Sequence, residues 1–418
     1  MSMRARLCSA VCAGLIVAFH AAAESAQASP RWVATWTTSP SAATDSEDLI
    51  RWNEANPQKA WAQASILSGT LRYRLQIAKG GRELRLTIAN TYERAMIHLA
   101  GVSVGMAGKG FDAVPTTLTE VKFGGEAGMT IPAGARAISD PVDLPVSDGE
   151  NLIVSLYVPD GIAVMAYPPQ PTFSSVDIAA GANQIMSAHV RGGHLLNSRT
   201  PVTEVDVLAT DCKGVVVAVG DSITDGNLYD GLRGWPGVLA RRLAPQGISV
   251  VDAVIGGNRV LSPQGPVERS LLARFDDDVL TIPGMTHIIL LEGINDIGGM
   301  GTSEPYGPLP TVSAAELIAG YRQVIAKAHM RNVKVIGATI LPFAGSFYYS
   351  PAKDVIRRAV NQWIRTSGEF DGVIDFAAAL RDPSEPDRIR PNLTVDHLHP
   401  NGEGYRLMGE MIDLRLFQ

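Results

Sequence analysis

The 418-residue chain is poor in cysteine, with three, and poor in aromatic residues, which make up 6% of it. Neither sign of charge dominates, and a formal net charge of −6 gives no basic footprint for nucleic acid. Hydrophobic residues make up 46% of the chain and charged residues 19%, which excludes a disordered or fibrous protein. These absences leave an ordinary globular protein long enough for two or three domains, whose stability comes from packed cores.

An apolar run near the N-terminus, residues 13–19, is too short to span a membrane comfortably. It follows two arginines and precedes a cluster of small residues, which is the layout of a secretory signal peptide. We therefore predict a signal peptide over residues 1–28, cleaved after Ala23 or after Ala28. An uncleaved membrane anchor is the alternative.

Cleavage at the later site removes Arg4, Arg6 and Glu24, which carry +1 together, so the formal net charge changes from −6 to −7. It also leaves Cys212 as the only cysteine, so no internal disulfide can form. We predict a secreted or periplasmic protein with no nucleic-acid partner and no stable membrane insertion after cleavage. The sequence carries no signal for a particular oligomeric state.

Residues 29–210 are dominated by short alternating runs with turn residues between them. In LRYRLQI, residues 71–77, apolar side chains alternate with polar ones, and ELRLTI, residues 83–88, repeats the pattern after two glycines. This pair predicts a β-hairpin. With further runs such as LIVSLYV, residues 152–158, and no long helical pattern, the region is predicted to be an all-β sandwich or jelly roll.

Residues 211–418 follow a different pattern, in which strand-like runs alternate with helical segments. Ser313 and Glu316 form a capping box before one helix, and Ser350 with Pro351 starts another. Alternating β and α segments predict an α/β domain of three layers, a parallel sheet flanked by helices, with its active site at the carboxyl ends of the strands. The predicted strands are residues 215–219, 248–254, 286–291 and 333–340.

The segment GDSITDG, residues 220–226, places Ser222 directly after the first predicted strand. Gly, Asp and Ser are turn formers, so a strand-to-helix turn alone explains them. A phosphate loop would need Gly-Lys-Ser/Thr, and Asp221 and Asp225 would repel a phosphate. The segment is not the G-x-S-x-G elbow of α/β-hydrolases either. By itself it leaves the role of Ser222 open.

Three further segments add groups that ester hydrolysis requires. IGGNRVL, residues 255–261, and EGINDIGG, residues 292–299, each follow a predicted strand, and DHLHPNGEGY, residues 396–405, places Asp396 three residues before His399. A serine esterase needs a nucleophile, a base, a carboxylate that orients the base, and donors for the oxyanion. The four segments together contain a candidate for each.

The order and spacing of these segments resemble the SGNH, or GDSL, hydrolase family over about half of the chain. The resemblance implies that Ser222 attacks the ester carbonyl, His399 is the general base and Asp396 holds its imidazole. It also implies an oxyanion hole made by the backbone N–H groups of Ser222 and Gly257 and the side-chain amide of Asn295. No metal and no cofactor is implied.

Simpler interpretations of these residues remain open. His397 also lies beside Asp396, although only His399 completes the D-x-x-H spacing. Asn295 can serve only to cap a turn, and Gly257 only to make a bend. Five side chains near predicted strand ends are hypothesised to contact the substrate: Asn258, Arg259, Phe347, Tyr348 and Tyr349.

The N-terminal half resembles the β-rich domain that precedes the hydrolase domain in a subset of secreted bacterial SGNH proteins, with VATWTTSP, residues 33–40, as its marker. Four tryptophans there can stack on sugar rings or can belong to the core; they are Trp32, Trp36, Trp52 and Trp61. We therefore expect a secreted serine ester hydrolase that deacetylates carbohydrate or other small esters. The alternatives are a broad short-chain carboxylesterase or lipase-like esterase, an acyltransferase, and a glycan-binding protein with an inactive SGNH domain.

Overall fold

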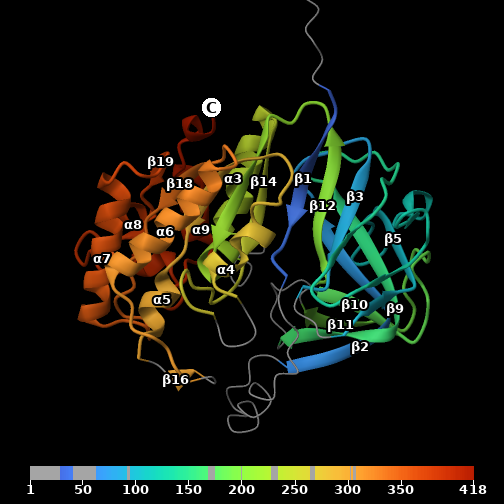
Figure 1. Ribbon diagram of the computed structural model, residues 1–418, viewed down its shortest axis with the longest axis horizontal. Helices are drawn as coiled ribbons and strands as arrows, with labels where there is room; N and C mark the ends of the chain where they lie inside the picture. The colour runs from blue at the N-terminus through green and yellow to red at the C-terminus, as the bar shows by residue number, and fades with distance from the viewer. Residues whose placement is uncertain are drawn as a thin grey trace, which may run out of the picture.

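The structure is a computed structural model (Figure 1) that combines antiparallel sheets in its N-terminal half with one parallel sheet in its C-terminal half. The predicted signal peptide, residues 1–28, lies outside the described residues. Among the described helices, none combines the length and the apolar character needed to cross a membrane. The structure describes residues 29–40, 63–91, 95–167, 175–198, 200–226, 234–263, 269–301, 303–304 and 307–418.

The N-terminal half contains two larger antiparallel sheets whose apolar faces share one core. Leu71, Tyr73 and Leu75 of one sheet and Leu86 and Ile88 of the other are all at most 2% exposed. The four-stranded sheet has the order β1 (Arg31–Thr37), β12 (Val202–Ala209), β3 (Leu84–Ala89), β8 (Arg136–Ile138). The six-stranded sheet has the order β11 (His194–Ser198), β10 (Ser175–Ala180), β2 (Gln63–Gln76), β9 (Asn151–Tyr167), β5 (Gly101–Met106), β6 (Thr119–Val121). A separate pair joins β4 (Ile97–Leu99) to β7 (Met129–Ile131).

The predicted hairpin of the two alternating runs is wrong. Both runs are strands, but β2 pairs with β9 and β10, whereas β3 pairs with β12 and β8. The connection between them passes from one sheet to the other: the Gly81 N–H donates to the Val146 carbonyl, and a Cβ on Gly80 would lie 2.4 Å from that oxygen. Alternation shows which face of a strand is buried but not which strand pairs with it. The same pattern is therefore compatible with a hairpin and with two strands in different sheets.

The polar face of β2 also departs from simple alternation. Arg72 is completely buried. Its guanidinium donates to the Ser155 hydroxyl and to backbone carbonyls that include those of Ser187 and Ala188. A loop therefore covers this part of the sheet, and its carbonyls satisfy the buried cation.

The C-terminal half is built on a five-stranded, fully parallel sheet, as predicted. Its strands, in spatial order, are β14 (Ile248–Val254), β13 (Gly214–Gly220), β15 (Met285–Leu291), β18 (Lys334–Ala338) and β19 (Gly372–Ile374). The four predicted strands match β13, β14, β15 and β18 closely, because each is an apolar run buried on both faces. A short antiparallel pair lies outside this sheet, formed by β16 (Ser303–Glu304) and β17 (Gly307–Pro308).

Helices flank the sheet in two groups. One group is α3 (Gly234–Leu243), α8 (Phe376–Leu380) and α9 (Gly402–Met411); the other is α4 (Leu271–Asp278), α5 (Ile294–Gly299), α6 (Ala314–His329) and α7 (Pro351–Thr366). The capping box of Ser313 and Glu316 is present at the start of α6, and Ser350 caps α7 with Pro351 in its first turn, which confirms both predicted helix starts. The remaining short helices are α2 (Ser222–Asp225), η1 (Pro115–Thr117), η2 (Ala244–Gln246), η3 (Pro391–Leu393) and η4 (Leu414–Phe417).

The two halves meet where β1 lies beside β14, the edge strand of the parallel sheet (Figure 1). The Ser249 hydroxyl donates to the Ala34 carbonyl at 2.9 Å, and the Thr37 hydroxyl donates to the Asp252 carbonyl at 2.7 Å. Of the four N-terminal tryptophans, Trp36 is buried and Trp32 lies under the guanidinium of Arg85, while Trp52 and Trp61 fall outside the described residues.

Candidate active site

Three predicted site residues follow three adjacent strands of the parallel sheet. Ser222 follows β13, Gly257 follows β14 on one side of it, and Asn295 follows β15 on the other. The chain therefore leaves β13 at the point where the strand order changes direction. Sheets of this kind gather functional side chains at such a point.

The turn after β13 is shaped by its own residues. Asp221 is the N-cap of α2, and its carboxylate accepts a hydrogen bond from the Ile223 N–H at 2.9 Å. Gly226 ends this helix with a φ of 62°, and its N–H donates to the Ser222 carbonyl. Ser222 is thus the first residue of a short, capped helix at the carboxyl end of β13. The turn residues of the sequence account for this placement.

Ser222, His399 and Asp396 form one hydrogen-bonded series. The Ser222 Oγ lies 2.9 Å from His399 Nε2, and His399 Nδ1 lies 2.8 Å from Asp396 Oδ2. The other carboxylate oxygen of Asp396 accepts the backbone N–H groups of Leu398 at 3.0 Å and of His399 at 2.8 Å. Partial burial opposes ionisation, but the hydrogen bonds from His399 outweigh it and lower the pKa of Asp396 to about 2. The loop thus holds an ionised carboxylate against the imidazole.

The two histidines of this loop, His397 and His399, make different contacts. His397 has a φ of 64°, in the left-handed region, and its ring lies against Gly345, where an added Cβ would be 3.1 Å from His397 Cγ. His399 makes both the contact to Ser222 and the contact to Asp396. The backbone reversal at His397 directs adjacent side chains to different neighbours, which explains why D-x-x-H, and not the adjacent pair, forms the series.

Gly257 and Asn295 flank Ser222 on the neighbouring strands. Gly257 has a φ of 78°, as the third residue of a turn closed by the Asn258 N–H and the Ile255 carbonyl at 3.1 Å. This conformation favours glycine. The Asn295 amide is held at both ends: Nδ2 donates to the Asn258 carbonyl at 3.0 Å, and Oδ1 accepts from the Tyr348 hydroxyl at 3.0 Å. These contacts orient the amide with its donor end on the side of the Gly257 loop.

The five predicted substrate contacts divide into buried and exposed side chains. Asn258 is completely buried and Arg259 is 2% exposed; both bond within the protein, Asn258 to Arg274 and Arg259 to the Asn295 carbonyl. The structure therefore favours a supporting role for these two over the substrate contact that the sequence suggested. Tyr348 bonds to Asn295 and its ring contacts that of Phe347 at a tilt, and Tyr349 packs edge-on against Phe343. Phe347 is 76% exposed, so its ring is free of the core.

Three carboxyl groups are buried close to Ser222, which the sequence pattern did not indicate. Burial raises the pKa of Asp221 to about 7 and that of Asp296 to about 6. The pKa of Glu292 is raised well above its ordinary value, by burial first and by the charge of Asp221 next. Neither carboxylate oxygen of Glu292 has a hydrogen-bond partner among the described residues. Acidic residues at strand ends are typical of turns, so nothing in the sequence distinguished these three.

Within the described part of the chain, no three His, Cys, Asp or Glu side chains converge in a way that could hold a metal ion. Asp375, a further strand-end carboxylate of this half, caps α8 and forms an ion pair with Arg365. It lies outside the series that contains Ser222.

A serine, a histidine and a carboxylate in hydrogen-bonded series at the carboxyl end of a parallel strand are the arrangement of hydrolases that use a serine nucleophile. Residues 218–407 match the model of the GDSL-like lipase/acylhydrolase family. The C-terminal half of the chain is a domain of that family, and the protein is a carboxylic ester hydrolase. No curated protein sequence matches the chain at a significant level.

Solved structures resemble the chain over about half of its length. A lipolytic protein of the G-D-S-L family from Desulfitobacterium hafniense is 26% identical over 47% of this chain and 95% of its own, with a TM-score of 0.36. A GDSL-like lipase from Bacteroides thetaiotaomicron is 20% identical over 49% of this chain and 88% of its own, with a TM-score of 0.36. An acetyl xylan esterase is 24% identical over 47% of this chain and 96% of its own, also with a TM-score of 0.36.

Proposed function

We propose that this protein is a secreted serine ester hydrolase that works through an acyl-enzyme and removes acetyl groups from carbohydrate. One observation carries the mechanism: Ser222 Oγ, His399 and Asp396 are linked by contacts of 2.9 Å and 2.8 Å. A nucleophile within hydrogen-bond reach of a base, which is itself oriented by a carboxylate, is the arrangement that activates a serine.

In the acylation step, Ser222 Oγ attacks the ester carbonyl carbon while His399 Nε2 takes the hydroxyl proton. The C–O bond to the alcohol then breaks, and the protonated imidazole returns that proton to the departing alcohol. Asp396 stabilises the imidazolium from the Nδ1 side. Because the pKa of Asp396 is lowered to about 2, its carboxylate stays ionised through neutral and mildly acidic pH.

In the deacylation step, His399 takes a proton from water, the water oxygen attacks the acyl carbon, and the carboxylic acid leaves as Ser222 regains its proton. Both steps pass through an oxyanion. We assign its donors to the backbone N–H groups of Ser222 and Gly257 and to Asn295 Nδ2, which lie at three adjacent strand ends. Donors fixed in advance stabilise that charge without reorganisation.

Two features support a carbohydrate ester as the substrate. The N-terminal sequence has the layout of an export signal, and exported esterases meet polysaccharides outside the cytoplasm. The exposed ring of Phe347 lies in the loop after β18 that also supplies the Tyr348 contact to Asn295, so it can offer an apolar surface to a sugar or acyl group beside the site.

The test compares wild type, Ser222→Ala and Ser249→Ala on p-nitrophenyl acetate and on acetylated oligosaccharides. Ser222→Ala should lose about three to six orders of magnitude in kcat. Ser249 is more deeply buried than Ser222 and makes its contact at the amino end of β14, so Ser249→Ala serves as the serine control. Near-normal turnover by Ser222→Ala would refute the mechanism.

The substrate is tested separately from the mechanism. Faster release of acetate from oligosaccharides than from simple esters supports the carbohydrate assignment, whereas the reverse order indicates a broad short-chain esterase. Acetyl transfer to an added alcohol in preference to water indicates an acyltransferase. Glycan binding by wild type and Ser222→Ala alike, with no turnover by either, indicates a binding protein.

A further inference from the structure

A buried arginine joins the N-terminal half of the chain to the loop beside Ser222. Arg274, in α4, is completely buried. Its Nη1 donates to the Ser39 hydroxyl at 2.9 Å, and its Nε donates to Asn258 Oδ1 at 2.9 Å. Both Nη atoms also lie 3.2 Å from the Ala253 carbonyl, near the end of β14. One guanidinium therefore bridges the segment after β1 and the loop that contains Gly257.

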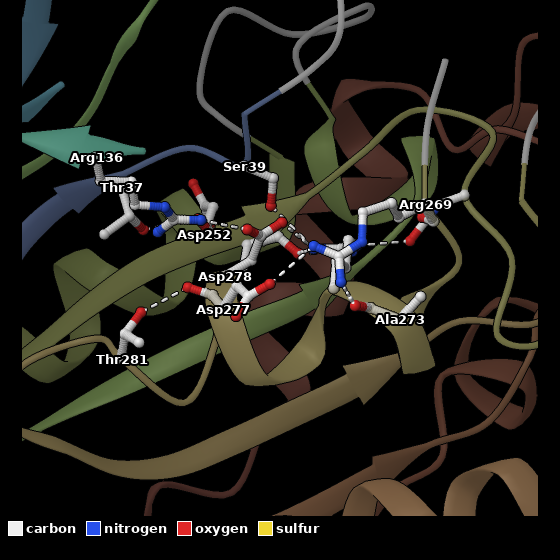
Figure 2. A network of polar contacts seen from close by, with 12 residues as sticks. Thr37, Ser39, Arg136, Asp252, Arg269, Ala273, Asp277, Asp278 and Thr281 are labelled. Carbon is white, nitrogen blue, oxygen red and sulfur yellow. Dashed lines mark hydrogen bonds and ion pairs between the residues drawn. The ribbon is translucent and has the colours of Figure 1, made fainter. Parts of the chain in front are cut away.

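A second residue of the N-terminal half reaches the same place. Arg136, in β8, forms an ion pair with Asp278 at 2.5 Å, and the other oxygen of Asp278 lies 3.8 Å from Arg274. The Asp278 side chain is completely buried. Figure 2 shows Ser39, Arg136 and Asp278 gathered in this polar network at the boundary of the two halves. The positive charge of Arg274 is thus held between a hydroxyl and a carboxylate that the N-terminal half helps to place.

The network continues from Asn258 to the oxyanion donors. Asn258 directly follows Gly257, and its carbonyl accepts the Asn295 Nδ2 hydrogen bond at 3.0 Å. Its side chain is anchored on the other side by a bond from Nδ2 to the Arg269 carbonyl at 2.9 Å. A shift of Asn258 would therefore move the Gly257 N–H and turn the Asn295 amide together.

We propose that Ser39 and Arg136 are positioning residues for the oxyanion hole, acting through Arg274 and Asn258, so that the N-terminal β half is part of the catalytic unit. This inference rests on the proposed ester hydrolase function. Oxyanion stabilisation depends on donors fixed in place before the charge develops, and a displacement of about 1 Å is costly in rate, by about 10²-fold in sensitive cases.

The chain offers a matched pair of serines for the test. Ser39 and Ser249 are both almost fully buried, and each makes a 2.9 Å hydrogen bond across the boundary between the halves. Ser39 lies in the network at the carboxyl end of β14, whereas Ser249 lies at the amino end of that strand. Loss of either bond weakens the contact between the halves, but only Ser39→Ala disturbs Asn258.

We expect Ser39→Ala to lower kcat on p-nitrophenyl acetate by about fivefold, the effect of one lost hydrogen bond, with KM unchanged. Ser249→Ala should stay within about twofold of wild type in kcat. Thermal unfolding of both variants checks that their losses of stability are comparable. Equal kcat for the two variants would show that Ser39 is only structural and would overturn the inference.

A double-mutant cycle tests the route through the oxyanion hole. Asn295→Ala should lower kcat by about 10²–10³-fold. In that background Ser39→Ala should lose part of its effect, because Asn295, one of the two oxyanion donors that Asn258 positions, is gone. Fully additive losses in kcat would contradict the inference while leaving the proposed function intact. Wild-type turnover by Ser222→Ala would instead refute the proposed function, and this inference with it.

Discussion

One buried polar side chain of the N-terminal half, Arg72, and the buried carboxyl groups around Ser222 differ in how well they are matched. In the N-terminal half, Arg72 is completely buried, and its guanidinium donates to one hydroxyl and several carbonyls. Around Ser222, by contrast, burial raises the pKa of Asp221, Glu292 and Asp296, and Glu292 finds no partner for either oxygen among the described residues. Matched groups stabilise a fold, whereas perturbed carboxyl groups cluster at functional sites.

The largest effect that we predict from this contrast is a loss of kcat and not a loss of stability. Asp396→Asn should lower kcat by about 10⁴-fold, because the amide favours the wrong imidazole tautomer, while the free energy of unfolding falls only slightly. Asp375→Asn is the control, since that carboxylate also follows a strand of this half but pairs with Arg365. Steady-state kinetics check both variants. Equal losses in kcat would remove the special role given to Asp396.

At Arg72, which lies away from the network of Ser39 and Arg274, the loss of a buried polar group should affect stability alone. Arg72→Met leaves buried carbonyls without their donor and should lower the free energy of unfolding by about 3 kcal/mol, with little change in kcat. Arg74→Met is the matched control, because Arg74 is exposed on the same strand and bonds to the Gly108 and Gly110 carbonyls. Urea unfolding measures the difference, and a similar loss for both variants would contradict the burial argument.

The smallest effect concerns the unpartnered carboxyl group and depends on pH. The pKa of Glu292 is raised by burial from its ordinary value of 4.5, so the folded protein holds this proton after the unfolded chain has released it. Glu292 therefore costs stability increasingly as pH rises above about 4.5. Glu292→Gln cannot ionise, so its stability relative to wild type should improve as pH rises from about 4 to 8 in urea unfolding.

Glu369 gives the control with the opposite sign. Hydrogen bonds from Arg322 and Trp363 lower the pKa of Glu369 to about 2, so its contribution is present above pH 4.5 and is lost as pH falls toward 2. Glu369→Gln should thus be slightly less stable than wild type at neutral pH and approach it in acid. A Glu292→Gln curve parallel to wild type at every pH would show that folding does not raise the pKa of Glu292.

Predictions from the sequence were confirmed where the predicted feature depends on residues that are close together in the chain. The capping box at Ser313 and the Ser350-Pro351 start of α7 are confirmed, because a cap depends only on the next few residues. The parallel strands are confirmed, because burial on both faces leaves a continuous apolar run. The hairpin failed, because alternation at residues 71–77 and 83–88 contains no information about the partner strand.

For the site, the sequence by itself determined the residue types and their places at strand ends: a serine after β13, a glycine after β14, an asparagine after β15, and an aspartate three residues before a histidine. Only the tertiary structure decided which groups meet. It placed His399 and not His397 against Ser222, buried Asn258 and Arg259 as supports, and brought Arg274 between Ser39 and Asn258. The physical reason is distance along the chain: contacts within a turn are set by neighbouring residues, whereas contacts such as Ser39 to Arg274 form only when separate sheets pack together.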